Sequence, residues 1–150
     1  MTARLLLDTN VIVYPHDPSE PEKQRAAALL VERIHRSGVG CISTQVLSEF
    51  YSVMTTKLRP RIPQAAALAS LERHANLWRV FPVTTEVILE AAHASVRFGI
   101  HFWNAQLWAV AHVNQLGYIV SEDMQHGVEI GGVRILSPFR HDWRMEDLVR

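Results

Sequence analysis

The chain has 150 residues, and its 15 basic and 15 acidic side chains give a formal net charge of zero. This length fits one domain with a sizeable core. An apolar fraction of 48% and a charged fraction of 20% are typical of a folded globular protein. The charge balance excludes binding of duplex nucleic acid through overall positive charge, so any such contact has to be local or bridged by metal.

The lack of a recognisable targeting signal and the single cysteine favour the cytoplasm. The N-terminus enters an apolar strand without the segment and cleavage site of an exported precursor. Apolar stretches stay well short of the roughly 20 residues that span a bilayer, so we expect no membrane contact. The single cysteine, Cys41, excludes an internal disulfide and is predicted to be buried.

The stretch from Leu5 to Tyr14 opens the predicted fold. Its apolar run predicts a strand buried on both faces, as in a parallel sheet, with Asp8 and Asn10 at its carboxyl end. Parallel α/β sheets bind ligands at that edge. Side chains two residues apart in a strand point the same way, so Asp8 and Asn10 are expected to share a crevice while Thr9 points elsewhere.

Further along the chain, short apolar strands alternate with helical segments. Ser19 and Glu22 resemble a capping box at the start of the first helix. This alternation predicts βαβ units around a mostly parallel sheet. The expected strands cover residues 39–42, 78–83, 118–123 and part of 128–138, and the expected helices cover 19–38, 45–56, 63–75, 86–98 and 101–117.

Acidic and amide side chains fall at the ends of these elements. Glu49 lies among apolar residues of a helix, so its carboxylate needs a partner. Asp123 follows a strand and shares a face with Ser121, and Asp8 follows the first strand. Asn104 lies in the first turn of a helix, where the helix dipole favours an anion. We expect the sheet to bring these side chains together.

Three crowded carboxylates are costly to ionise together. A hard cation such as Mg²⁺ or Mn²⁺ removes that repulsion and binds carboxylate oxygens, water and phosphate. The pattern therefore predicts nuclease or phosphatase chemistry. The chain has no Gly-rich phosphate loop, no G-x-S-x-G elbow and no C-x-x-C or H-E-x-x-H motif. Ordinary helix caps and surface pairs are the alternative interpretation of the acids.

One local basic cluster and one histidine have both a structural and a functional interpretation. Lys57, Arg59 and Arg61 lie among prolines after a helix. This composition favours a solvated connector, and a contact surface for RNA phosphates is the alternative. His126 is close to Asp123, and a supporting or surface role is favoured over catalysis.

Four aromatic residues fall at helical spacing, which favours a place in the core or in a dimer interface over base stacking. They are Phe98, Phe102, Trp103 and Trp108.

Four motifs, in order, resemble the PIN-domain family, and most of all the single-domain ribonuclease toxins of VapBC-type toxin–antitoxin modules. The resemblance covers roughly residues 4–139 and includes the closing Gly-Val-Arg-Ile-Leu-Ser-Pro-Phe. The motifs are Leu-Leu-Asp8-Thr-Asn10, Ser-Thr44-Gln-Val-Leu-Ser-Glu49-Phe-Tyr, Phe-Trp-Asn104-Ala and Ser121-Glu-Asp123-Met-Gln-His-Gly.

The resemblance implies a PIN-like α/β/α sandwich with a central, mostly parallel sheet of four to five strands over residues 1–139. Residues 140–150 would form a C-terminal tail that packs on the domain or binds a partner. The implied activity is a Mg²⁺- or Mn²⁺-dependent endoribonuclease acting on structured RNA such as tRNA or rRNA. The implied partners are the RNA substrate, a second copy in a homodimer and a small antitoxin.

The resemblance also assigns the site. The catalytic and metal-binding positions would be Asp8, Glu49, Asn104 and Asp123, supported by Asn10, Thr44 and Ser121.

Asn104 is a departure, because the family pattern has a third aspartate there. The amide keeps the shape but loses a negative charge and is unable to act as a base. Natural tolerance, a weakened natural member and an engineered substitution each explain it, and an attenuated or inactive enzyme is expected. The alternative function is a non-cleaving PIN-fold module that binds RNA or an antitoxin. A phosphatase is less favoured, because the chain lacks an Asp-x-Asp nucleophile pair.

Overall fold

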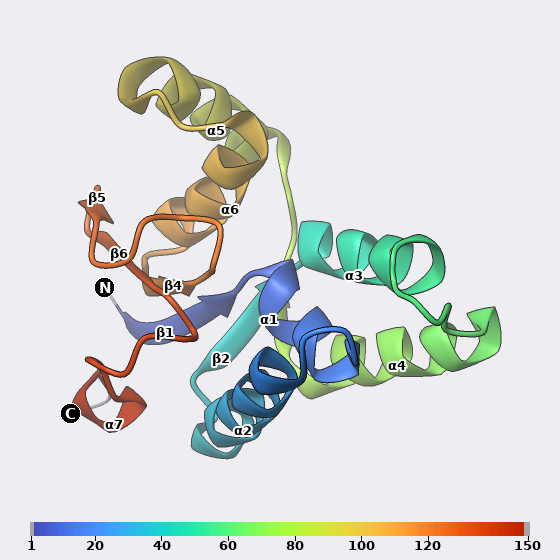
Figure 1. Ribbon diagram of the computed structural model, residues 1–150. Helices are drawn as coiled ribbons and strands as arrows, with labels where there is room; N and C mark the ends of the chain where they lie inside the picture. Colours follow the sequence, from blue (N-terminus) through green and yellow to red (C-terminus); the bar gives the residue numbers. More distant parts are fainter. Residues whose placement is uncertain (1, 149–150) are drawn as a thin grey trace.

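A six-stranded sheet runs through the molecule in the order β3-β2-β1-β4-β6-β5 (Figure 1). The computed structural model describes residues 2–148. All neighbouring strands pair in parallel except β5, which pairs antiparallel with β6. The predicted α/β fold with a mostly parallel sheet is confirmed, and the two-residue β5 adds a sixth strand. The strands are β1 (Thr2–Leu7), β2 (Gly40–Ser43), β3 (Arg79–Phe81), β4 (Leu116–Val120), β5 (Glu129–Ile130) and β6 (Val133–Leu136).

Helices flank the sheet and pack in pairs. In Figure 1, α5 and α6 lie together beside β4, α3 and α4 form a second pair, and α2 lies beside β2. This cover on both faces explains the apolar run of β1, in which Leu5, Leu6 and Leu7 are fully buried. The helices are α1 (Thr9–Val13), the 3₁₀ turn η1 (Tyr14–His16), α2 (Pro21–Ser37), α3 (Thr44–Thr56), α4 (Gln64–Leu77), α5 (Thr85–Phe98), α6 (Phe102–Val113) and α7 (Met145–Leu148).

The first strand is shorter than predicted. β1 ends at Leu7, and Asp8 caps the helix α1 by accepting a hydrogen bond from the backbone N–H of Thr9. Aspartate is a favoured N-cap residue, so the strand ends where Asp8 begins the helix. The apolar residues from Val11 to Val13 are therefore buried as a helical turn rather than as a strand.

Two predicted helix boundaries are wrong. Ser19 does not cap α2, because its N–H and hydroxyl both donate to the carboxylate of Asp17 (3.0 and 2.6 Å). The helix expected to run from 101 to Gly117 ends at Val113, because Gln115 takes a positive φ of 56° and Gly117 already belongs to β4.

Residues 140–148 lie against the rest of the chain. The indole of Trp143 donates to the carbonyl of Ser137 (2.8 Å), and Met145 and Leu148 pack on the core. The division of the chain at residue 139 stays a prediction. Cys41 is buried as expected, and burial raises the pKa of its thiol to about 12. Within residues 2–148, none of the helices has the length and apolarity needed to cross a membrane.

Candidate active site

Three carboxylates from three elements meet at the carboxyl edge of the sheet. Leu7 of β1 and Val120 of β4 are register partners, so the residues that follow them, Asp8 and Ser121, lie side by side. The hydroxyl of Ser121 donates to Oδ2 of Asp8 (2.6 Å). Strand β4 ends before residue 121, so Asp123 reaches the site from a loop rather than from the predicted strand. Glu49 comes from α3.

Asp8 is the most buried of these acids, with 8% of its surface exposed. Burial raises the pKa of this carboxyl to about 6, hydrogen bonds from Ser121 and Thr9 oppose that rise, and the charges of Asp123 and Glu49 add to it. Asp123 and Glu49 are therefore both close enough to Asp8 to disfavour its ionised form.

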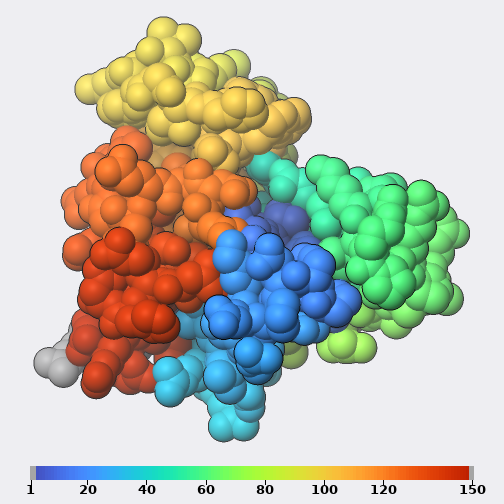
Figure 2. All heavy atoms as spheres, in the orientation of Figure 1, coloured from blue at the N-terminus to red at the C-terminus, as the bar shows by residue number. Residues whose placement is uncertain are grey.

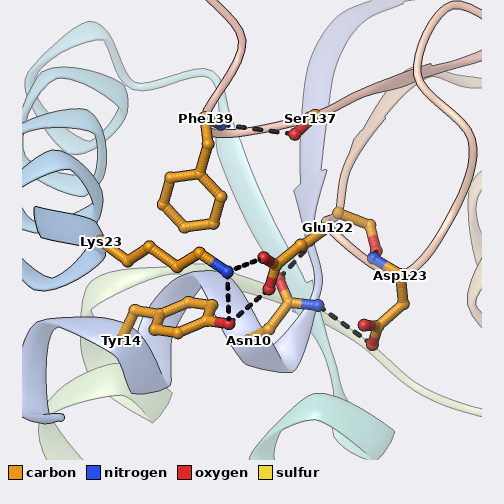
Figure 3. Close-up of polar contacts among 8 residues, drawn as sticks. Asn10, Tyr14, Lys23, Glu122, Asp123, Ser137 and Phe139 are labelled. Atoms are coloured by element: carbon orange, nitrogen blue, oxygen red, sulfur yellow. Dashed lines mark hydrogen bonds and ion pairs between the residues drawn. The ribbon is translucent and has the colours of Figure 1, made fainter. Parts of the chain in front are cut away.

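Asn10 connects two of the acids. Its amide nitrogen donates to Oδ2 of Asp8 and to Oδ2 of Asp123, both at 3.2 Å. Figure 3 shows the bond to Asp123. Its carbonyl oxygen accepts from the backbone N–H of Glu122 (3.4 Å). Asn10 thus fixes the loop after β4 against the start of α1.

Glu49 is held by two donors. The hydroxyl of Thr9 and the amide of Gln45 each donate to it at 2.7 Å. The amide of Gln106 in turn donates to the Gln45 carbonyl (2.8 Å). The expectation that Thr9 points away from the site is wrong, because α1 begins at Thr9 and its first turn directs this side chain toward α3.

A second network of polar contacts, centred on Glu122, was not predicted from the sequence (Figure 3). Glu122 forms an ion pair with Lys23 of α2 and accepts a hydrogen bond from the hydroxyl of Tyr14. The Lys23 ammonium also lies over the rings of Tyr14 and Phe139, 5.2 and 5.3 Å from their centroids. An acid between Ser121 and Asp123 was a visible signal, but its partners come from positions about 100 residues away.

Within residues 2–148, Thr44 and Asn104 form no hydrogen bond with the three carboxylates. The hydroxyl of Thr44 accepts from the N–H of Val83 (3.0 Å) and so links the start of α3 to the segment after β3. Asn104 is half-buried in the first turn of α6, and its side chain forms no hydrogen bond within residues 2–148. Its neighbour Trp103 contacts the site through a backbone carbonyl that accepts from Gln45 (3.3 Å).

Of the basic cluster, Lys57 alone lines a cavity beside the acids. This cavity, about 350 Å³, is also lined by Asn10, Glu49 and Asp123. Figure 2 shows the surface hollowed where the blue N-terminal segment, the green segment after residue 44 and the orange loop meet. Arg59 instead donates to nearby backbone carbonyls, and Arg61 is exposed away from the cavity lining.

The oxygen donors of the site fit a hard cation, although the three carboxylates do not surround a single point. Between residues 2 and 148, no three Asp, Glu, His or Cys side chains form a ready metal-binding group. The Asn10 amide instead occupies the place between Asp8 and Asp123. In the same described range, no Lys, Arg or His forms an ion pair with Asp8, Glu49 or Asp123. Oxygen-only donors with uncompensated charge are what Mg²⁺ prefers.

His126 points away from the acids. Its Nδ1 accepts from the N–H of Ser137 (2.9 Å), and its Nε2 lies 3.3 Å from the carboxylate of Asp142. These contacts favour a structural role over a catalytic one.

Comparisons with known proteins identify the class. The family model for the PIN domain matches residues 5–126, so the chain belongs to the PIN-domain family. No curated protein sequence matches the chain.

Solved structures share this fold at low sequence identity. A toxin–antitoxin complex from Klebsiella pneumoniae is 13% identical, covers 90% of this chain and 98% of its own, and gives a TM-score of 0.66. The DNA-bound VapBC from Salmonella typhimurium is 19% identical with coverages of 92% and 99% and a TM-score of 0.63. The Mycobacterium tuberculosis VapC20, described as a Sarcin-Ricin loop cleaving toxin, is 21% identical with coverages of 77% and 86% and a TM-score of 0.59. The family and the PIN fold predicted from the motifs are confirmed.

Proposed function

We propose that this chain is the metal-dependent endoribonuclease of a VapBC-type toxin–antitoxin module. The observation that carries the proposal is the convergence of Asp8, Glu49 and Asp123 without a basic partner in the described chain. Such an arrangement suits hydrolysis of a phosphodiester, whose own charge also needs a cation. The described activity of the structurally similar VapC20 supports RNA as the substrate.

Mg²⁺ or Mn²⁺ would be held by Asp8, Glu49 and Asp123, with Asn104 as a weaker neutral donor at the start of α6. When bound, the ion supplies a Lewis acid that polarises the phosphodiester and activates water. Asn104 contributes no negative charge, so the chain as written is expected to bind the ion weakly and cleave slowly.

The surrounding polar residues orient the acids. Ser121 holds Asp8, and Asn10 holds Asp123. Lys57 lines the same cavity as Glu49 and Asp123, and there it would neutralise a neighbouring phosphate of the substrate. Because the net charge of the chain is zero, it would hold RNA through such local basic side chains rather than through an overall positive charge.

The proposed partners are an antitoxin, an RNA substrate and a second copy in a homodimer, within the cytoplasm. The structural neighbours from Klebsiella pneumoniae and Salmonella typhimurium are toxin–antitoxin complexes, which supports an antitoxin for this chain as well. A tRNA or an rRNA is the proposed substrate class.

A second candidate is a non-cleaving module that binds RNA or the antitoxin. Asn104 favours it, because an amide in place of an acid removes a charged ligand and any base at this position.

RNA cleavage with Mg²⁺ or Mn²⁺ tests the two candidates. We compare the chain as written, Asn104→Asp, and Asp8→Ala as the blank. The nuclease proposal expects Asn104→Asp to cleave faster than the chain as written and Asp8→Ala to be inactive but folded. Cleavage that survives in Asp8→Ala would overturn the site, and metal binding without cleavage in Asn104→Asp would favour the binding module.

A further inference from the structure

A second cavity opens on the other side of Glu49. It has a volume of about 620 Å³ and lies between α3 and the start of α6. Thr44, Ser48 and Ser52, four residues apart on α3, line one wall with hydroxyl groups. Trp103 lines the cavity from α6. Glu49 therefore borders both this cavity and the one that holds Lys57.

Trp103 is unusually exposed for its size. It has 56% of its surface exposed, whereas Trp108, on the same helix, has 2%. The Trp103 ring packs edge to face on Phe102, with centroids 5.2 Å apart. Leaving a large aromatic ring uncovered is costly, so its exposed face is suited to contact with a flat partner.

The position of Trp103 is coupled to the acidic site. Gln45 donates both to Glu49 (2.7 Å) and to the backbone carbonyl of Trp103 (3.3 Å). Gln106, which has 6% of its surface exposed, donates to Gln45 (2.8 Å). This chain of amides, buried at Gln106 and half-buried at Gln45, ties the backbone of Trp103 to the Glu49 carboxylate.

The chemistry of the walls selects the ligand. The cavity is lined by no Lys, Arg or His among the described residues, so it is unsuited to a phosphate. A large aromatic side chain and three hydroxyl side chains in one cavity suit a neutral planar group with hydrogen-bonding edges. The Ser48 hydroxyl donates to the Thr44 carbonyl (3.2 Å) and can still accept a hydrogen bond. A nucleobase has this character, and unpaired bases in RNA commonly stack on aromatic side chains.

We propose that this cavity binds an unpaired nucleobase of single-stranded or looped RNA, stacked on Trp103, next to the phosphate that the acids receive. The inference rests on the proposed function for its substrate class. Lys57 and Trp103 then lie on opposite sides of Glu49, one for a phosphate and the other for a base. Trp103, one of the aromatic residues predicted to belong to the core or to a dimer interface, becomes a base-binding residue.

The test measures binding without cleavage. The full chain in EDTA is titrated into a short single-stranded RNA that carries 2-aminopurine, whose fluorescence reports stacking. Trp103→Ala is expected to weaken binding roughly fivefold to a hundredfold and to abolish the fluorescence change, because stacking on one aromatic residue contributes that much. Trp103→Phe should restore most of both. Leu89→Ala is the control, since Leu89 is 57% exposed but lies on α5 and lines a different cavity.

The outcomes separate this inference from the nuclease proposal. Unchanged RNA affinity and fluorescence in Trp103→Ala would overturn the subsite, even if the protein cleaves RNA. A change from dimer to monomer in Trp103→Ala, with RNA affinity unaltered, would overturn it by assigning Trp103 to a protein interface. A third outcome is that stacking depends on Trp103 but the Asn104→Asp variant cleaves no RNA. This result would support the subsite and reject the nuclease proposal.

Discussion

At the scale of single residues, the site depends on side chains that hold the acids. Asn10 donates to both Asp8 and Asp123, and it accepts from the backbone of Glu122. The Glu122 side chain is itself fixed by Lys23, so a partly buried ion pair positions the loop that carries Asp123 (Figure 3). Outer partners of this kind tune metal ligands without touching the ion.

Glu122→Gln should therefore weaken Mn²⁺ binding roughly tenfold or more while the protein stays folded, because Lys23 loses its charged partner and the loop loosens. Titration calorimetry with Mn²⁺ measures this. Glu32→Gln is the matched control, since Glu32 pairs with Arg36 on the exposed face of α2 (2.6 Å) and should not affect the ion. Equal Mn²⁺ affinity in Glu122→Gln and the unchanged chain would show that the ion pair has no positioning role.

At the scale of elements, Gly40 of strand β2 lets two neighbouring side chains approach the strand closely. A Cβ added at Gly40 would lie 2.5 Å from Cζ3 of Trp78 and 2.6 Å from Cγ2 of Ile34. These side chains come from the residue just before β3 and from α2, so the glycine lets both pack over one strand. A larger residue forces that layer apart.

Gly40→Ala should destabilise the fold by about 1–3 kcal/mol, the usual cost of overpacking a core. Urea denaturation measures the loss. The same substitution in a Trp78→Leu background should cost less by about 1 kcal/mol, because the closest atom of the clash has been removed. If the cost is equal in both backgrounds, the clash with Trp78 is not its cause, and the contact with Ile34 or the backbone freedom of glycine remains as the explanation.

The elements themselves were largely predictable from local chemistry. Gly38 and Gly99 end helices in left-handed conformation (φ 72° and 66°), and Ser43 caps α3 by accepting from the N–H of Val46. The errors arose where a polar residue had two local uses. Asp8 follows β1 as expected but also caps α1, so Asn10 lies in a helix rather than at the end of a strand. Ser19 was expected to cap a helix but hydrogen-bonds to Asp17 instead.

The site was predictable only in part, because its contacts join distant segments. The sequence pattern indicated Asp8 and Asp123 because each follows an apolar strand. It indicated Glu49 because this residue lies among apolar residues of a helix. The roles of Lys23 and Gln106 depend on which helices pack together, and no local pattern carries that information.

At the scale of the whole molecule, two buried groups oppose each other in their effect on stability. His74, 8% exposed, accepts from the Trp78 indole (3.0 Å) and packs on Phe50, and burial lowers its pKa to about 4. Between about pH 4 and pH 6.5, the unfolded chain therefore binds a proton at His74 that the folded chain does not bind. The contribution of neutral His74 to stability is complete above about pH 6.5 and is lost as the pH falls toward 4. Asp8 behaves in the opposite way, because its raised pKa of about 6 makes the folded chain take up a proton.

From about pH 4 to about pH 6, stability should thus rise with pH through His74 and fall through Asp8, each by about 3 kcal/mol. Single variants separate the two contributions. Asp8→Asn in EDTA should leave a stability that rises with pH across this window, and His74→Asn, which keeps an acceptor for the Trp78 indole, should leave one that falls. Urea denaturation at several pH values measures the slopes, which do not depend on any constant packing loss. A slope unchanged by Asp8→Asn would mean that folding does not raise the pKa of Asp8, so that neither burial nor the neighbouring carboxylates disfavour its charge enough to call for a cation.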